Sequence, residues 1–361
     1  MKKNKNGMIE IMRFVFCVII ILFHLYNRNP VVFSHDLSFF RHGRIGVEFF
    51  FLVSGYLLAN SAYRQFDSGD IVKNTAGFMY KKVMNIFPYH VFVFAVDVVI
   101  FYIVKEWKGV SMALQRFVSY LPGLFFLQKS GIKCVEVNTI EWYIPAMLVA
   151  MTVLYPLVLF YKDRFTKIAC PIITVVIIGY LIHSTGQLGG VNQFVFNDTL
   201  PKVYVRAFAE LCAGVFLYEV VQYFKDREPG KTKKVLLTVI ELGCYGSVIF
   251  YTVTDWTNKY EAQAFYALAV AVALTFSEKT YTAKKFNNKF VYFLGRFSLP
   301  LYLAQSIALN IYDGAETIQN MRLAYQAVYV VAASVIFALI TMFVCDGIKK
   351  LIEKRKITIK I

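Results

Sequence analysis

Apolar residues are gathered in ten blocks along the chain, separated by short polar and basic stretches. The blocks occupy residues 8–27, 44–62, 86–104, 142–161, 168–183, 203–223, 235–254, 262–278, 291–312 and 325–348. Most approach the roughly 20 residues that an α-helix needs to cross about 30 Å of hydrocarbon. The pattern predicts an all-α fold, a polytopic membrane helical bundle with about ten transmembrane helices.

Basic residues between the blocks indicate how the helices are oriented. When alternate loops are assigned to opposite sides, 25 lysines and arginines lie on the side that holds both termini and 11 on the other. Cytoplasmic loops are the ones enriched in lysine and arginine. We therefore expect both termini to be cytoplasmic.

The composition supports a membrane protein. Hydrophobic residues make up 58% and charged residues 17%, whereas a soluble domain is about half apolar and about a quarter charged. The net charge of +16 would suggest nucleic acid in a soluble protein, but here the basic residues flank apolar blocks. That placement is typical of anchoring to membrane lipid, so no nucleic-acid partner is expected. Most cysteines lie inside apolar blocks and no C-x-x-C occurs, so no metal site is expected.

Two ionisable side chains of the first predicted helix are candidate functional groups. Arg13 and His24 are eleven residues apart, and eleven steps of 100° come within about 20° of three full turns. Both side chains therefore project from one face, about 16 Å apart, with Arg13 nearer the cytoplasm. Ionisable groups in a spanning helix are costly and often functional. The alternative is a packing arginine, paired locally with Glu10, and an interfacial histidine.

The second block offers a carboxylate and small residues that could complement this face. It reads G-V-E-F-F-F-L-V-S-G-Y from Gly46 to Tyr56. We expect Glu48 to lie at the depth of His24, where a carboxylate can orient an imidazole. Ser54 and Gly55 permit close helix approach. The alternative is that Glu48 lies among lipid headgroups and faces water.

These motifs resemble those of the integral-membrane acyltransferase-3 family, whose members modify cell-surface glycans. The family pattern is R-x10-H in the first helix and G-V-[D/E]-x-F-F-x-x-S-G in the second, and both match. Further matches lie at Tyr80–Val83 with Pro88, Asn138–Tyr143 with Tyr155-Pro156, Arg206–Glu210 with Gly214, and Gly295–Ser298 with Tyr302-Leu303. Gln305 departs from the pattern, because many members have a histidine there. The role of that histidine is therefore not carried over.

The resemblance implies a single integral-membrane acyltransferase domain over residues 1–361, in a bacterial cytoplasmic membrane and without the esterase-like domain that some members append. The expected reaction moves an acyl group, acetyl in the first place, from cytoplasmic acyl-CoA to a hydroxyl of an extracytoplasmic or membrane-linked glycan. Acetyl-CoA would be a co-substrate, with no cofactor bound permanently. The carbohydrate acceptor would be an exopolysaccharide, lipopolysaccharide, peptidoglycan or wall polymer.

The chemistry of that reaction suggests two catalytic groups. His24 is the expected general base, because an imidazole titrates near neutral pH. A covalent acyl-His24 intermediate is the variant that stays open. Glu48 is expected to orient His24.

The same reaction needs groups that bind the two substrates. Arg13, Lys81 and Lys82 can supply cations for the phosphates of CoA. The small Ser54 would leave space for the thioester. Trp142 and Arg206 are candidates for contact with the acceptor.

Two other functions stay open. A transporter or flippase of a glycan precursor or acyl donor would also carry intramembrane charges, although the two similar halves typical of such proteins are not evident. A non-catalytic subunit of a polysaccharide machine is disfavoured by the intact Arg13 and His24 pair. Among the remaining histidines, His35 and His42 are expected in a solvated outer loop and His90 at the inner surface.

Overall fold

The computed structural model describes residues 6–28, 40–65, 69–106, 110–225, 227–254 and 258–358. The α-helices are α1 (Gly7–Arg28), α3 (Ile45–Gln65), α4 (Ile71–Phe101), α5 (Val110–Leu124), α6 (Tyr143–Arg164), α7 (Cys170–Thr185), α8 (Lys202–Lys225), α9 (Lys231–Thr252), α10 (Glu261–Ser277), α11 (Thr282–Lys285), α12 (Lys289–Asp313), α13 (Glu316–Gln319) and α14 (Leu323–Thr358). Short π-helices follow α4 (Tyr102–Glu106) and α6 (Phe165–Ala169), and a 3₁₀ turn (Asn258–Tyr260) precedes α10. A hairpin of β1 (Phe194–Val195) and β2 (Leu200–Pro201) precedes α8.

Eight of the ten predicted apolar blocks coincide with helices to within about four residues, whereas α4 begins 15 residues before block 86–104 and α14 ends 10 residues after block 325–348. Among the described residues, 6 helices are both long and apolar enough to cross a membrane. One of these counted spans, Tyr143–Thr185, joins α6 and α7, and α10 has only 17 residues. The all-α membrane bundle is therefore confirmed as a class, while ten crossings and cytoplasmic termini stay predictions. The pattern did not predict α5 or the β1–β2 hairpin.

The chain divides into two compact units, each built from separate parts of the sequence. The first unit comprises Met1–Lys82 and Trp142–Gly295, and the second comprises Val83–Glu141 and Arg296–Ile361. The expected single domain over residues 1–361 stays a prediction, because this division concerns packing within the chain. Both units draw on both halves of the sequence.

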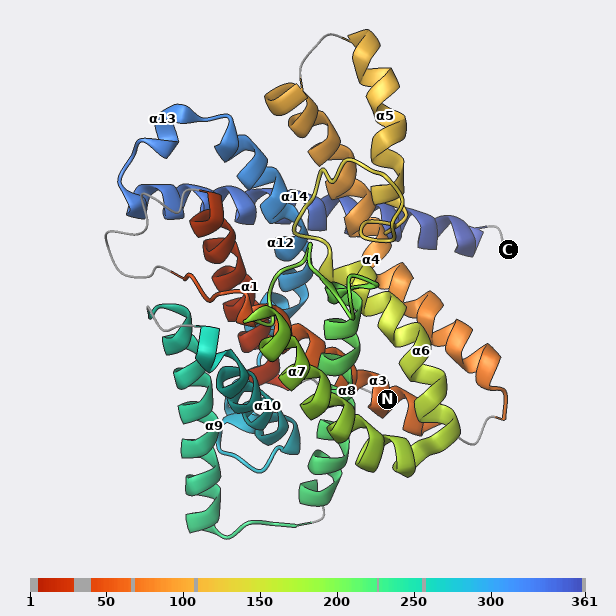
Figure 1. Ribbon diagram of the computed structural model, residues 1–361, viewed down its shortest axis with the longest axis vertical. Helices are drawn as coiled ribbons and strands as arrows, with labels where there is room; N and C mark the ends of the chain where they lie inside the picture. Colours follow the sequence, from red (N-terminus) through yellow and green to blue (C-terminus); the bar gives the residue numbers. More distant parts are fainter. Residues whose placement is uncertain are drawn as a thin grey trace. The chain divides into compact units, whose positions relative to one another are not determined.

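In the first unit α8 occupies a central position, packed against α3, α6, α7 and α10 (Figure 1). Helices α3 and α8 approach each other closely at Gly55 and Gly214. A Cβ on Gly55 would overlap the carbonyl of Leu211, and a Cβ on Gly214 would overlap the carbonyl of Leu52. Glycine is therefore required on both helices for this packing, as is common where membrane helices meet.

Helices α1 and α3 pack in antiparallel register in the same unit. The rings of Phe16 and Phe49 stack with centroids 4.8 Å apart. A Cβ on Gly46 would contact Phe16 and Ile20, and a Cβ on Gly43 would contact Phe23. Residue numbers therefore rise along α1 as they fall along α3. This register fixes the relative depth of the charged residues on the two helices.

The second unit also contains buried ionisable side chains. Asp97 of α4 is completely buried and accepts hydrogen bonds from Ser306 and from Asn310 Nδ2 (3.1 Å) of α12. His90 Nδ1 lies 2.5 Å from Glu141 Oε1, and His90 is only 1% exposed. The expectation of an interfacial His90 is therefore wrong, because a carboxylate in the loop between α5 and α6 provides a buried partner.

Candidate active site

All of the predicted site residues lie in the first unit. They belong to α1 (Arg13, His24), α3 (Glu48, Ser54), the first half of α4 (Lys81, Lys82), the position before α6 (Trp142) and α8 (Arg206). They therefore all belong to one compact unit.

The N-terminal part of α1 presents a cationic cluster. Arg13 Nη1 contacts Glu10 Oε2 at 3.0 Å, and the Arg13 side chain stays 30% exposed. Gly295 makes room for this pair, since a Cβ there would overlap the Glu10 carboxylate. Lys82 lies within electrostatic range of Arg13, whereas Lys81 is exposed. The predicted local pair with Glu10 is present, and Lys82 leaves the cluster with excess positive charge.

His24 lies near the opposite end of the same uninterrupted helix. Its ring packs beside Phe23, with centroids 5.2 Å apart, and it is partly buried. Cys17 and Ile20 lie between Arg13 and His24 on this face, and both are completely buried. The two predicted functional residues are therefore separated by a packed layer of apolar side chains.

Glu48 does not lie at the depth of His24, and this expectation is wrong. The stacking of Phe16 on Phe49 places Glu48 level with Phe16. His24 is eight residues further along α1, a rise of about 12 Å, which no hydrogen bond can span. The prediction failed because sequence does not state how far two antiparallel helices overlap.

The partner of Glu48 is Arg206. Arg206 Nη2 lies 2.6 Å from Glu48 Oε1, and Arg206 Nε donates to Glu210 Oε1 at 2.6 Å. Both carboxylates are completely buried and Arg206 is 2% exposed. One guanidinium is thus shared by two carboxylates, so each buried acid has an opposite charge in contact with it.

Trp142 supports this buried arginine. The guanidinium carbon of Arg206 lies 5.2 Å from the centre of the Trp142 ring, within range of a cation–π contact. Trp142 is 7% exposed. Both candidates for acceptor contact are therefore packed against each other, so one face of the indole is occupied by protein.

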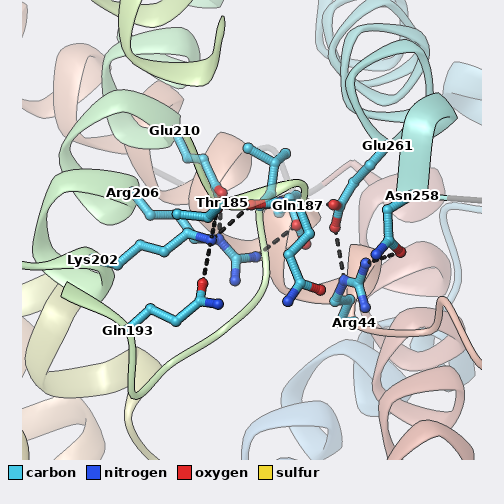
Figure 2. A network of polar contacts seen from close by, with 11 residues as sticks. Arg44, Thr185, Gln187, Gln193, Lys202, Arg206, Glu210, Asn258 and Glu261 are labelled. Atoms are coloured by element: carbon cyan, nitrogen blue, oxygen red, sulfur yellow. Dashed lines mark hydrogen bonds and ion pairs between the residues drawn. The ribbon is translucent and has the colours of Figure 1, made fainter. Parts of the chain in front are cut away.

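A second polar network surrounds the start of α8 (Figure 2). The ammonium group of Lys202 donates to Thr185 Oγ1 (2.6 Å), the carbonyl oxygen of Gln187 (2.7 Å) and Gln193 Oε1 (2.9 Å). Lys202 is 1% exposed. The loop between α7 and α8 is thus held to α8 by a buried cation that hydrogen-bonds neutral oxygens.

The network continues to the start of α10 (Figure 2). Arg44 donates to Glu261 Oε1 and to Asn258 Oδ1, both at 2.7 Å, and the N–H of Leu188 donates to Glu261 Oε2 at 2.7 Å. Burial favours a higher pKa for Glu261, but the charge and hydrogen bond of Arg44 hold that pKa below its ordinary value. Glu261, the first residue of α10, therefore ties Arg44 and the loop between α7 and α8 to the start of α10.

Tyr143 was not selected from the sequence, although it lies among the predicted residues. It is 8% exposed, its hydroxyl donates to Met147 Sδ (3.2 Å), and Ser54 is a hydrogen-bonding partner. Its hydroxyl is also within electrostatic range of Arg13 and Glu210. Tyr143 therefore lies close enough to both Arg13 and Glu210 to interact with each.

Two further outcomes concern residues outside the predicted site. His42 is 2% exposed and stacks on Tyr251 with centroids 4.5 Å apart, so the expected solvated position is wrong. His35 lies outside the described residues. Glu210 could have been found from sequence, because it lies four residues after Arg206 in an apolar block, where such pairs meet on one helix face.

The helices and buried charges described above define a multi-pass membrane protein with a polar interior. The profile of the family described as "Acyltransferase domain" matches residues 6–345. The chain therefore belongs to the acyltransferase-3 family.

The chain is also similar to proteins of Staphylococcus aureus strains COL, MSSA476 and MRSA252 that carry the name "Putative O-acetyltransferase". Each is 21% identical over 300 residues, which cover 76% of this chain and 47% of the relative. The chain thus spans about half the length of the curated relatives it matches. No solved structure is significantly similar to it.

Proposed function

We propose that this protein is a membrane O-acyltransferase of a bacterial cytoplasmic membrane. It moves an acyl group, acetyl in the first place, from cytoplasmic acyl-CoA to a hydroxyl of an extracytoplasmic or membrane-linked glycan. The observation that carries the proposal is the pair of Arg13 and His24 on one uninterrupted helix, α1. Family membership and the named relatives support the reaction class.

The cationic cluster at the inner part of α1 is suited to the donor. CoA carries phosphates, and an arginine fork binds phosphate oxygens with two parallel hydrogen bonds. Arg13 keeps part of its side chain exposed, and Lys82 adds a second positive charge. Lys81, which is exposed, can meet the same ligand at the inner surface.

His24 is the proposed general base. The acceptor hydroxyl oxygen attacks the thioester carbonyl carbon while its proton passes to the imidazole. The carbon–sulfur bond then breaks, and the leaving thiolate takes that proton, so His24 returns to its neutral form. Cys17 and Ile20 are packed between Arg13 and His24. The acyl end of a CoA whose phosphates bind Arg13 can therefore reach His24 only when this layer opens during turnover.

The direct test is acetyl transfer by purified protein in liposomes. Labelled acetyl-CoA is supplied on one side and candidate glycans on the other, and label in the glycan is measured. We expect transfer that requires both substrates. Movement of glycan precursor across the bilayer without acetylation would instead support the transporter alternative and contradict the proposal.

A further inference from the structure

The start of α1 is tied to the segment that joins α10 to α12. Asn6 caps the helix, since its Oδ1 accepts hydrogen bonds from the backbone N–H groups of Met8 (3.1 Å) and Ile9 (3.3 Å). Its amide Nδ2 donates to the carbonyl of Thr275, in the last turn of α10, at 2.8 Å. The N–H of Gly7 donates to Asn287 Oδ1 at 2.8 Å. Asn6 therefore both caps α1 and anchors it.

Glu241 of α9 holds the same segment from the other side. Its Oε1 accepts a hydrogen bond from Thr275 Oγ1 and its Oε2 one from Thr282 Oγ1, both at 2.6 Å. The hydroxyls of Tyr245 and Thr275 are also hydrogen-bonded, at 3.0 Å. Glu241 is completely buried. Burying a carboxylate inside a spanning helix costs free energy, so such a residue commonly has a specific role.

The anchored end of α1 carries the cation assigned to the donor. Arg13 lies about two helical turns beyond Asn6 and pairs with Glu10 between them. An α-helix hardly bends over two turns, so the position of Asn6 sets the depth and rotation of Arg13. Glu241 is therefore connected to Arg13 through Thr275, Asn6 and the helix itself.

We propose that Glu241 is a positioning residue for donor binding. By holding Thr275 and Thr282, it fixes the start of α1 and presents the Arg13 guanidinium to the phosphates of acyl-CoA. This inference rests on the proposed function, because it takes Arg13 as the donor-binding cation.

Three substitutions separate this positioning from general folding. Glu241→Leu removes both acceptors, while Thr275 and Thr282 keep the Ala271 carbonyl and the Thr280 hydroxyl as partners. Glu241→Gln retains the bridge, because an amide can accept from one threonine and donate to the other. Asn6→Ser preserves a capping oxygen and loses only the donor to Thr275.

The measurement is steady-state acetyl transfer by full-length variants in liposomes. We expect Glu241→Leu and Asn6→Ser to raise the KM for acetyl-CoA about three- to tenfold, the effect of losing a hydrogen bond, with the acceptor KM unchanged. Glu241→Gln should stay near wild type. Thr252→Val is the matched control, because this buried threonine at the C-terminal end of α9 donates within its own helix to Ile249.

Several results would overturn the inference. One is a loss of thermal stability in Asn6→Ser and Glu241→Leu with the acetyl-CoA KM unchanged. Another is a Glu241→Gln defect as large as that of Glu241→Leu, since charge rather than bridging would then matter. If Glu241→Leu fails to fold, Asn6→Ser carries the test alone.

Arg13→Ala distinguishes this inference from the function on which it rests. If Arg13→Ala leaves the acetyl-CoA KM unchanged, the donor site of the proposed function is wrong. If Arg13→Ala raises that KM while Asn6→Ser does not, only the positioning role of Glu241 fails.

Discussion

At the scale of single residues, the charges inside the first unit form two groups with different surroundings. Arg206 is enclosed between Glu48, Glu210 and Trp142. Arg13 pairs with one carboxylate among the described residues, that of Glu10, and is partly exposed. The enclosed arginine is suited to holding α3 and α8 together, and the exposed one to binding a ligand.

Replacement of Arg13 by lysine should weaken donor binding. Lysine keeps the charge but lacks the planar fork that binds phosphate with two hydrogen bonds. We expect Arg13→Lys to raise the acetyl-CoA KM about tenfold, with little change in the acceptor KM. A raised acceptor KM with unchanged acetyl-CoA binding would reassign Arg13 to the acceptor.

The depth of Glu48 changes what a double substitution should show. Sites more than about 7–10 Å apart without shared partners usually act independently, and Glu48 lies about 12 Å from His24 along α1. We expect the effects of His24→Ala and Glu48→Gln on kcat/KM to add within about 0.5 kcal/mol. A double variant no slower than His24→Ala would mean that the two residues act as a unit after all.

At the scale of helices, close packing of α3 on α8 depends on two glycines. Gly214→Ala would drive a methyl group into the carbonyl of Leu52. The backbone of α3 cannot shift without disturbing its own packing, so we expect the free energy of unfolding to fall by about 1–3 kcal/mol, as is typical of overpacked protein interiors. The midpoint of thermal unfolding in detergent measures this loss.

The control for that substitution lies on another helix. Gly246 of α9 has no neighbour near its Cβ position among the described residues. Gly246→Ala should therefore leave stability unchanged or raise it slightly, because alanine favours helix. An equal loss of thermal stability in Gly214→Ala and Gly246→Ala would contradict the packing role of Gly55 and Gly214.

Helices were predictable from sequence, but their register was not. Apolar blocks of spanning length give the helices directly, because backbone in lipid must bond within its own segment. The overlap of α1 and α3 depends on side-chain packing such as Phe16 on Phe49. Sequence therefore found Arg13, His24, Glu48 and Arg206 as unusual charges, but paired Glu48 with the wrong residue.

At the scale of the whole molecule, the orientation in the membrane is the prediction with the widest consequences. In variants with a single cysteine, one at position 361 should be protected from an impermeant thiol reagent in intact cells. Cys134, in the loop between α5 and α6, should react. Burial and the neighbouring Glu136 raise the pKa of Cys134, so its labelling should speed up as the pH rises. Labelling at position 361 would place Arg13 and His24 on the wrong sides.

The account depends most directly on His24 as the base that activates the acceptor. The decisive measurement is the rate of acetyl transfer from acetyl-CoA to glycan by His24→Ala protein in liposomes. His183→Ala is the matched control, because this histidine is exposed in the last turn of α7. We predict a loss of at least about a hundredfold for His24→Ala, the usual contribution of a general base, and none for His183→Ala. Transfer by His24→Ala at the wild-type rate would contradict the mechanism.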